Sequence, residues 1–258
     1  MAGKEKQSYY FINSLAKATK ILELLAETGE LSVSEIGKKL GMHRSATHRF
    51  LATLRELAFL EQSEHSRYRL SFKLFELGTK GANRLEVTRV AHPFLLDLAS
   101  RHEDTANLGI MDNTDVIYVD KVESPHLLRM DFTIGHRVPA YCTAMGKAML
   151  ANRPETEVQK LFRGVKFENR TPKTILSLHD LLQCLRPIRE EGYAVDDEEL
   201  SLGTRCIASP IFDFTGRCVA AISIAGPTLR ITYDKIEQIR ASLSCVSNAI
   251  SMRLGHKG

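Results

Sequence analysis

One face of the segment at residues 44–58 gathers side chains that can bind a polyanion. The residues that fall on this face at helical spacing are Arg44, Ser45, His48, Arg49 and Ala52. Arginines neutralise phosphates, and Ser, His and Arg side chains reach base edges in a major groove. The opposite face should pack inward, and it is formed by Thr47, Phe50, Leu51, Leu54 and Leu57. A solvated surface helix has the same pattern, so the neighbouring elements must decide between the two.

The residues before this segment predict two further helices. The first spans residues 14–28, and its inward face is predicted to contain Leu15, Ala18, Ile21, Leu22, Leu24 and Leu25. The second is short, because Ser32 and Glu35 have the spacing of a capping box and Gly41 is typical of a helix end. The second and third helices then read as a helix-turn-helix with residues 44–58 as the recognition helix.

Residues 59–70 predict a β-hairpin around the polar turn at 63–66, in the position of the wing of a winged helix. Arg67 and Arg69 alternate with Tyr68 and Leu70, so both cations should lie on one strand face. Residues 1–85 have a net charge of +5, which leaves −1 for the rest of the chain. Local positive charge on such a unit favours binding to double-stranded DNA. A protein-docking module is the alternative.

Composition and length exclude several classes. A chain of 258 residues with 43% hydrophobic and 26% charged residues is typical of a globular protein with one large domain or two smaller ones. The start lacks the apolar region of a signal peptide, and no stretch of 18 apolar residues follows, so we expect a cytoplasmic protein with no membrane partner. The five cysteines have no zinc-site spacing, and we expect neither a metal nor another cofactor.

Residues 71–84 predict a linker helix with a bend at Gly78 and Gly81, followed by a second domain over 85–258. That domain alternates strands and helices. Hairpins are expected at 105–124 and 206–226 and a further strand at 127–135. The helices are expected at about 144–152, 155–163, 178–190 and 232–254. Antiparallel hairpins flanked by helices indicate an α+β sensor domain, and no nucleotide-binding glycine motif is present.

Two local patterns in the second domain are compatible with an anion site. Thr143 can cap a helix whose first-turn amides, those of Ala144, Met145 and Gly146, would attract an anion, although an ordinary helix cap has the same pattern. In "AISIAG", strand alternation places Ser223 and Ala225 on one face. For Asp197, Glu198 and Glu199 we expect a solvated loop.

Four segments resemble the IclR family of bacterial transcription regulators: "HRSATHRFLATL", "GHRVPAYCTAMGKAMLA", "EEGYAVDDEELSLGTRCIASPIFD" and "AAISIAGP". The resemblance implies an α+β chain with a winged helix-turn-helix domain (10–70), a linker helix (71–84) and a GAF-like effector domain (85–258). It also implies a repressor that works as a homodimer or a dimer of dimers. Within the family, the sequence most resembles regulators that respond to 2-keto-3-deoxygluconate. Ala46 and His43 depart from the family pattern; His43 weakens the N-cap of the third helix.

The same resemblance implies where a small carboxylate or sugar-acid effector binds. Asp196 should face the pocket, with Cys206 on the strand that follows. Ser223 should contact the ligand, and Ala225 stands where many relatives carry a second serine. The apolar wall is expected to contain Leu127, Met130 and Val138, each of which also suits an ordinary core.

An enzyme is the competing interpretation. It would use Cys206 or Cys142 as nucleophile with His126 or His136 as base, or Asp196 with Glu199 as an acid/base pair acting on a small carboxylic acid. No spacing demands such a pairing, and the helix-turn-helix would remain unexplained. His126 and His136 also have no spacing that supports a metal site.

Overall fold

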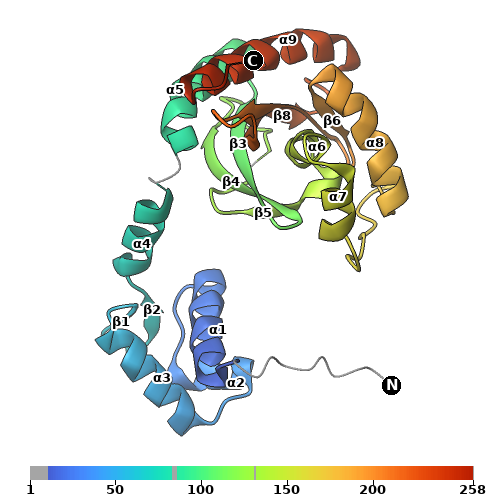
Figure 1. Ribbon diagram of the computed structural model, residues 1–258. Helices are drawn as coiled ribbons and strands as arrows, with labels where there is room; N and C mark the ends of the chain where they lie inside the picture. Colours follow the sequence, from blue (N-terminus) through green and yellow to red (C-terminus); the bar gives the residue numbers. More distant parts are fainter. Residues whose placement is uncertain (1–10, 83–85, 131, 258) are drawn as a thin grey trace. The chain divides into compact units, whose positions relative to one another are not determined.

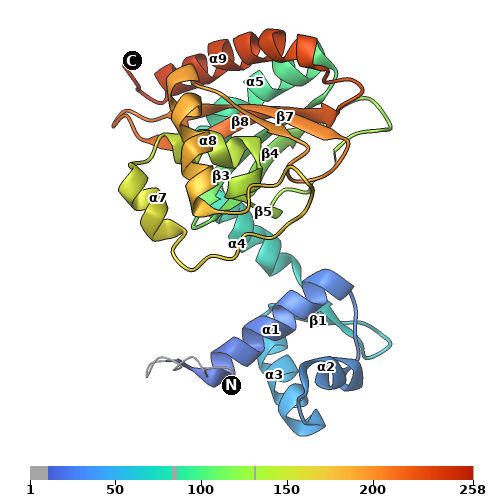
Figure 2. The same ribbon diagram turned by 90° about the vertical axis from the view of Figure 1, so that its right-hand side faces the viewer.

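The computed structural model describes residues 11–82, 86–130 and 132–257. The chain divides into two compact units, with the boundary after Gly81. Figures 1 and 2 show both units, and each is described by itself. Among the described residues, every helix is too short or too polar to cross a membrane.

The first unit is a three-helix bundle with a small hairpin. Its elements are α1 (Asn13–Thr28), α2 (Val33–Leu40), α3 (Arg44–Glu56), β1 (Leu60–Gln62) and β2 (Tyr68–Leu70). Buried side chains from every element except the turns form its core, with Ile21, Ile36 and Leu51 fully buried. The predicted helix-turn-helix and wing are confirmed.

Local chemistry sets the ends of α2. The Ser32 Oγ accepts a hydrogen bond from Glu35 N, and Glu35 Oε2 accepts one from Ser32 N at 2.7 Å, so the predicted capping box is present. Gly41 ends the helix with a left-handed φ of 63°. At Gly37 a Cβ atom would lie 3.2 Å from Thr47 Oγ1, so the missing side chain lets α2 and α3 pack closely.

The predicted bend after the wing is wrong. Helix α4 (Phe72–Ala82) continues through both Gly78 and Gly81. Glycine in a helix costs only about 1 kcal/mol relative to alanine, which the other residues of an eleven-residue helix can offset. The expected junction at residues 84 and 85 lies outside the described residues.

The second unit is built on a six-stranded antiparallel sheet with the order β5-β4-β3-β8-β7-β6. The strands are β3 (Thr105–Asp112), β4 (Asp115–Val122), β5 (Arg137–Pro139), β6 (Ala194–Asp197), β7 (Thr204–Phe212) and β8 (Cys218–Pro227). Both predicted hairpins, β3–β4 and β7–β8, are confirmed. Because β3 pairs with β8, the two hairpins join into one sheet.

The strand expected at 127–135 is wrong, since the described residues of that range form bends and a turn. In place of a strand ladder, hydrogen bonds to the start of β3 and the residues before it hold this segment. Ser124 Oγ donates to Glu103 O, and Thr105 Oγ1 donates to Met130 O. The chain turns at Gly135, and strand pairing resumes only at β5.

Helices cover both faces of the sheet, as Figure 2 shows. One face packs against α5 (Glu86–His102) and α9 (Ile236–Arg253), which follows the short turn η2 (Tyr233–Lys235). The other face packs against α6 (Ala144–Ala151), which follows η1 (Ala140–Cys142), and against α8 (Leu178–Glu191). Helix α7 (Glu155–Leu161) adds Val158 to this second core. The predicted α+β architecture is confirmed, and we call the α6-covered side the inner face.

Candidate functional site

The predicted two-sided character of α3 is present in the structure. Arg44, Ser45, His48 and Arg49 are exposed, whereas Thr47, Leu51 and Leu54 are buried. The N-cap residue His43 makes no side-chain capping hydrogen bond in the described part of the chain. The first-turn amides of α3 are therefore not capped by that side chain and suit a phosphate oxygen.

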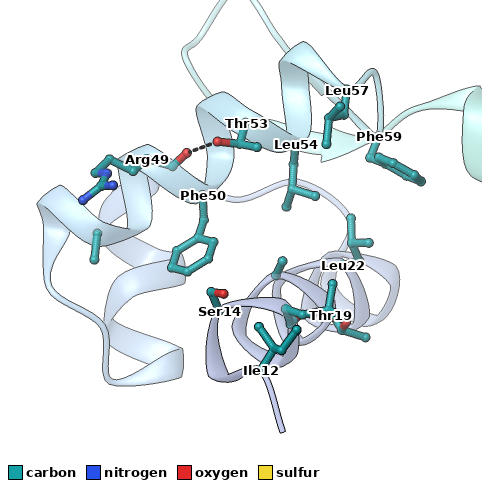
Figure 3. Close-up of a pocket in the computed structure, with 13 residues that line it drawn as sticks. Ile12, Ser14, Thr19, Leu22, Arg49, Phe50, Thr53, Leu54, Leu57 and Phe59 are labelled. Atoms are coloured by element: carbon teal, nitrogen blue, oxygen red, sulfur yellow. Dashed lines mark hydrogen bonds between the residues drawn. The ribbon is translucent and has the colours of Figure 1, made fainter. Parts of the chain in front are cut away.

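Leu15 and Leu57 do not pack inward as expected, because they are 65% and 52% exposed. Both line an apolar groove of about 720 Å³ between α1 and α3. Figure 3 shows Leu57, Phe50 and Ile12 around this groove. Leu57 is the C-cap residue of α3, so it follows the last helical turn and leaves the buried stripe.

The two wing arginines are both paired with carboxylates. Arg67 precedes β2, donates to Glu30 O and forms an ion pair with Glu35 at 3.0 Å. Arg69 lies within β2 and pairs with Glu61 at 3.1 Å. A DNA phosphate would have to compete with these carboxylates, and a role of either arginine in DNA binding stays a prediction.

A second basic feature beside α3 was missed in the sequence. Lys17 and Lys20 of α1 line a hollow of about 220 Å³ together with His43 and Ala46 at the start of α3. Both lysines are exposed. The signal was their spacing of three residues, which places them on one polar face of the first helix.

In the second unit, strand register brings the predicted effector residues together on the inner face. One row runs across four strands in the order Thr105, Ala225, Cys206, Asp196. The next row on the same face runs Asn107, Ser223, Ala208, Ala194. The prediction that Ser223 and Ala225 share a face is confirmed, since Ile222 and Ile224 belong to the opposite core. Small side chains therefore separate a carboxyl group from a group of neutral polar side chains.

Asp196 is the acidic end of this floor and is 1% exposed. Its Oδ1 accepts hydrogen bonds from Glu199 N at 2.8 Å and Leu200 N at 3.4 Å. Burial, and next the charge of Glu199, raise the pKa of the Asp196 carboxyl to about 7. Near neutral pH the group can therefore either donate or accept a hydrogen bond.

The sequence analysis missed Lys147, which is 1% exposed in α6. Its Nζ donates to Val195 O at 2.7 Å and forms an ion pair with Glu199. The available signal was a single charged residue in the otherwise uncharged stretch 138–152. A lysine buried that deeply requires an acidic partner.

The expectation of a solvated loop is wrong for Asp197 and Glu199. The Glu199 side chain is 12% exposed, and its Oε2 is buried with no hydrogen-bond partner among the described residues. Asp197 pairs with Arg205 at 2.6 Å and with Lys173 at 2.8 Å. Lys147 and Lys173 come from distant parts of the chain, so local sequence does not reveal these two pairings.

Helix α6 packs along its length against the inner face of the sheet, and its first turn is buried there. Thr143 caps it as predicted, and the Thr143 Oγ1 accepts from Gly146 N at 3.3 Å. One of the three expected anion-binding amides is thereby used, which leaves those of Ala144 and Met145. A Cβ at Gly146 would collide with the carbonyl oxygen of Ala140, so glycine is required for this turn.

Two of the three residues predicted for the apolar wall pack against the core, and the third does not. Val138 is buried, and the Sδ of Met130 lies 3.9 Å from the Cys206 thiol, which donates to it. Leu127, in contrast, is 99% exposed and forms no part of a buried wall. Its strand was not formed, so nothing holds its side chain against the sheet.

Tyr118 of β4 is a further inner-face residue that sequence reasoning missed. It is 4% exposed and packs in the same core as Met145 and Cys206. Burial is the main cause that raises the pKa of its phenol well above the usual value. The phenol therefore stays protonated and can donate a hydrogen bond.

The two histidines considered for metal binding have different neighbours. His126 Nε2 is 3.8 Å from Glu103, and the His136 ring stacks on Phe132 with ring centroids 4.8 Å apart. A search of the described residues finds no group of three His, Cys, Asp or Glu side chains placed to hold a metal ion.

Comparisons with known proteins agree with both units. Residues 14–64 match the family model of the IclR helix-turn-helix domain, and residues 79–252 match that of the bacterial transcriptional regulator IclR C-terminal domain. The HTH-type transcriptional regulator KdgR of Escherichia coli K12 is 36% identical over 246 residues, which cover 95% of this chain and 94% of the relative. The transcriptional repressor IclR of the same strain is 33% identical over 248 residues, covering 95% and 90%.

Solved structures give the same result. The crystal structure of the Thermotoga maritima IclR superposes with a TM-score of 0.82 at 36% identity, covering 95% of this chain and all of that one. The chain belongs to the IclR family of bacterial transcription regulators, with a helix-turn-helix DNA-binding domain and a C-terminal effector-binding domain.

Proposed function

We propose that the protein is a repressor that binds an operator through α3 and is released when a small carboxylic or sugar acid binds the inner face of its sheet. The observation that carries the proposal is the polar floor on the sheet face that α6 covers, with Asp196 at one end and Ser223 at the other. One relative is named a repressor, which supports the direction of control.

The chemistry of the floor supports an acid ligand. The free amides of Ala144 and Met145 and the Ser223 hydroxyl are donors for a carboxylate. Asp196 can bind a hydroxyl or a hydrated carbonyl group of the same molecule. Strands β6 and β8 are two strand spacings apart, about 10 Å, so a ligand that reaches both ends has several carbon atoms between its polar groups.

Several features support binding without chemical turnover. Burial, followed by the charge of Asp196, raises the pKa of the Cys206 thiol well above its ordinary value, and burial raises that of Cys142 to about 12. Such thiols stay protonated and are weak nucleophiles. Among the described residues the Cys142 thiol donates to Pro139 O and the Cys206 thiol donates to Met130 Sδ, so the hydrogen-bond acceptor of neither thiol is a histidine.

A homodimer suits this function, because helix-turn-helix proteins read paired half-sites with two-fold symmetry. Assembly into a dimer of dimers is the extension that the family resemblance suggests. Such a regulator works in the cytoplasm, where its operator lies.

The experiment is a fluorescence-anisotropy titration of the protein against DNA from its own upstream region. It is repeated with saturating pyruvate, glyoxylate, gluconate or 2-keto-3-deoxygluconate. We expect one of these acids to lower the affinity for DNA. Unchanged DNA affinity with all four acids would contradict the proposal, as would measurable conversion of any acid by the purified protein.

A further inference from the structure

Asn107 is a buried polar residue of the inner face that the function described so far does not use. It is 4% exposed and lies directly opposite Ser223 in the β3–β8 ladder. Among the described residues, its side-chain hydrogen bond joins Nδ2 to the Ser223 Oγ at 3.4 Å. An amide nitrogen carries two N–H groups, so this long bond leaves donor capacity beside the serine.

A side chain from α6 packs against the face of β3 that carries Asn107. Gly109 follows two residues later on the same face of β3, and a Cβ there would lie 3.0 Å from the Sδ of Met145. The absent side chain leaves room for the end of the Met145 side chain against β3. The Ser223 hydroxyl and the Asn107 amide are the hydrogen-bond donors at this end of the floor.

The opposite end of the floor has a different character. There Asp196 lies beside the Glu199–Lys147 ion pair, and Ala225, Cys206 and Ala208 separate these residues from Ser223. A carboxylate ligand is therefore repelled from the Asp196 end when that residue is ionised, and it is held best by neutral donors at the Asn107 end. Lys121, opposite Asn107 on β4, forms an ion pair with Glu123 at 2.8 Å, so the carboxylate of Glu123 balances its charge.

We propose that Asn107 is a specificity-determining residue of the effector site, whose side-chain amide binds the ligand carboxylate together with the Ser223 hydroxyl. This inference rests on the proposed function and fixes the orientation of the acid, with its carboxylate toward β3 and its hydroxyl-bearing end toward Asp196. Asn107 binds the ligand itself, and its contact with Ser223 is not its sole role.

The test is a double-mutant cycle by calorimetric titration with pyruvate and 2-keto-3-deoxygluconate. The variants are Asn107→Ala, Ser223→Ala and the double variant. If Asn107 contacts the ligand, Asn107→Ala in the Ser223→Ala background weakens binding by about tenfold more, the loss of one hydrogen bond to a charged group. If Asn107 only positions Ser223, the double variant binds as Ser223→Ala does, and the inference is overturned.

Two further variants separate charge from packing. Asn107→Asp keeps the shape but places a second carboxylate beside that of the ligand, so it should weaken binding more than Asn107→Ala does. It also carries the test if the alanine variant does not fold, and binding at least as tight as wild type would overturn the inference. Asn169→Asp, at an exposed site, is the matched control and should bind normally. Ala225→Ser adds a hydroxyl next to Ser223 and should restore part of the affinity lost by Asn107→Ala.

The outcomes also distinguish this inference from the proposed function. If Ser223→Ala and Asp196→Asn impair binding but neither Asn107 variant does, the site is correct and the role of Asn107 is wrong. If wild-type protein binds none of the four acids named above, or if the Ser223 and Asp196 variants bind as wild type does, the proposed effector site fails and the role of Asn107 fails with it.

Discussion

Asp196 lowers the stability of the fold but supplies a hydrogen-bonding group for the proposed ligand. Its carboxyl is buried beside Glu199, and its pKa is raised to about 7 from an ordinary value of 3.8. In this pH window the folded protein binds more protons than the unfolded chain, so the free energy of unfolding falls as the pH rises from about 4 to about 7. A protein that retains such a group gives up stability to keep a switchable donor and acceptor in its floor.

Asp196→Asn should therefore stabilise the ligand-free protein above neutral pH. The amide oxygen of asparagine can still accept from Glu199 N and Leu200 N, while the cost of ionising a buried group disappears. We expect the free energy of unfolding to rise by about 1 to 4 kcal/mol at pH 8 and to change little at about pH 4. Urea denaturation at the two pH values measures this, and an equal effect at both would show that ionisation is not the cause.

Ser223 should determine how tightly the acid binds, whereas Asp196 should determine which acid is preferred. Removing the hydroxyl in Ser223→Ala deletes one hydrogen bond to the ligand carboxylate, about 1.5 to 3 kcal/mol or a ten- to hundredfold loss of affinity. Calorimetric titration with an acid that the wild type binds gives the number. Ser201→Ala, at an exposed position, is the control. A Ser223 variant with wild-type affinity would place the carboxylate elsewhere.

Asp196→Asn should instead change which acids are preferred, because an amide also donates hydrogen bonds. The comparison is the ratio of affinities for pyruvate, glyoxylate, gluconate and 2-keto-3-deoxygluconate in the variant and in wild type. The same ratios in both proteins would remove Asp196 from the ligand contacts.

The site residues that could be predicted from the sequence are those whose position follows from neighbouring residues. The residues that were missed depend on contacts between segments far apart in the chain. The shared face of Ser223 and Ala225 follows from alternation within one strand. Asn107 becomes a neighbour of Ser223 only because β3 pairs with β8, more than a hundred residues later in the chain. The partner of Lys147 is likewise far away in sequence. No local period encodes such a pairing.

At the scale of elements, we predict that α3 contacts DNA phosphates, and a salt titration tests this. Replacing both Arg44 and Arg49 with alanine should weaken operator binding and reduce the slope of log K against log salt by about one unit per lost phosphate contact. Arg163→Ala/Arg217→Ala, two exposed sites in the second unit, removes the same charge and should leave the slope unchanged. If the α3 variant is folded and keeps the wild-type slope, DNA contacts a different surface.

Helices were easier to predict than the strand at 127–135. A helix closes its hydrogen bonds within its own sequence, and caps such as Ser32 and Thr143 mark its start. A strand requires a partner, and the residues at 124–130 are instead held by single hydrogen bonds to the start of β3 and the residues before it. The exposed Leu127 is a direct consequence. The bend expected at Gly78 failed for the opposite reason, since an exposed glycine only weakens a helix.

At the scale of the whole molecule, each unit has its own buried core, so each can hold its fold while the connection between them carries the signal. Coupling between two sites is a free energy that acts in both directions. A ligand that lowers the affinity for DNA must itself bind more weakly when DNA is bound. Typical coupling energies of about 1 to 3 kcal/mol correspond to changes of about 5- to 150-fold in affinity.

Cutting the chain after Ala82, at the end of α4, should separate binding from regulation. The fragment of residues 83–258 should bind its acid with nearly the affinity of the intact protein, because the inner face of the sheet lies entirely within it. The fragment of residues 1–82 should bind DNA with an affinity that does not respond to the acid, even where the loss of dimer contacts lowers that affinity. Calorimetry of the first fragment and anisotropy of the second, with saturating acid and without, provide the measurement. An acid that changes DNA binding by the isolated first unit would place an effector site there, and equal DNA affinity of the intact protein with and without a bound acid would exclude the switch.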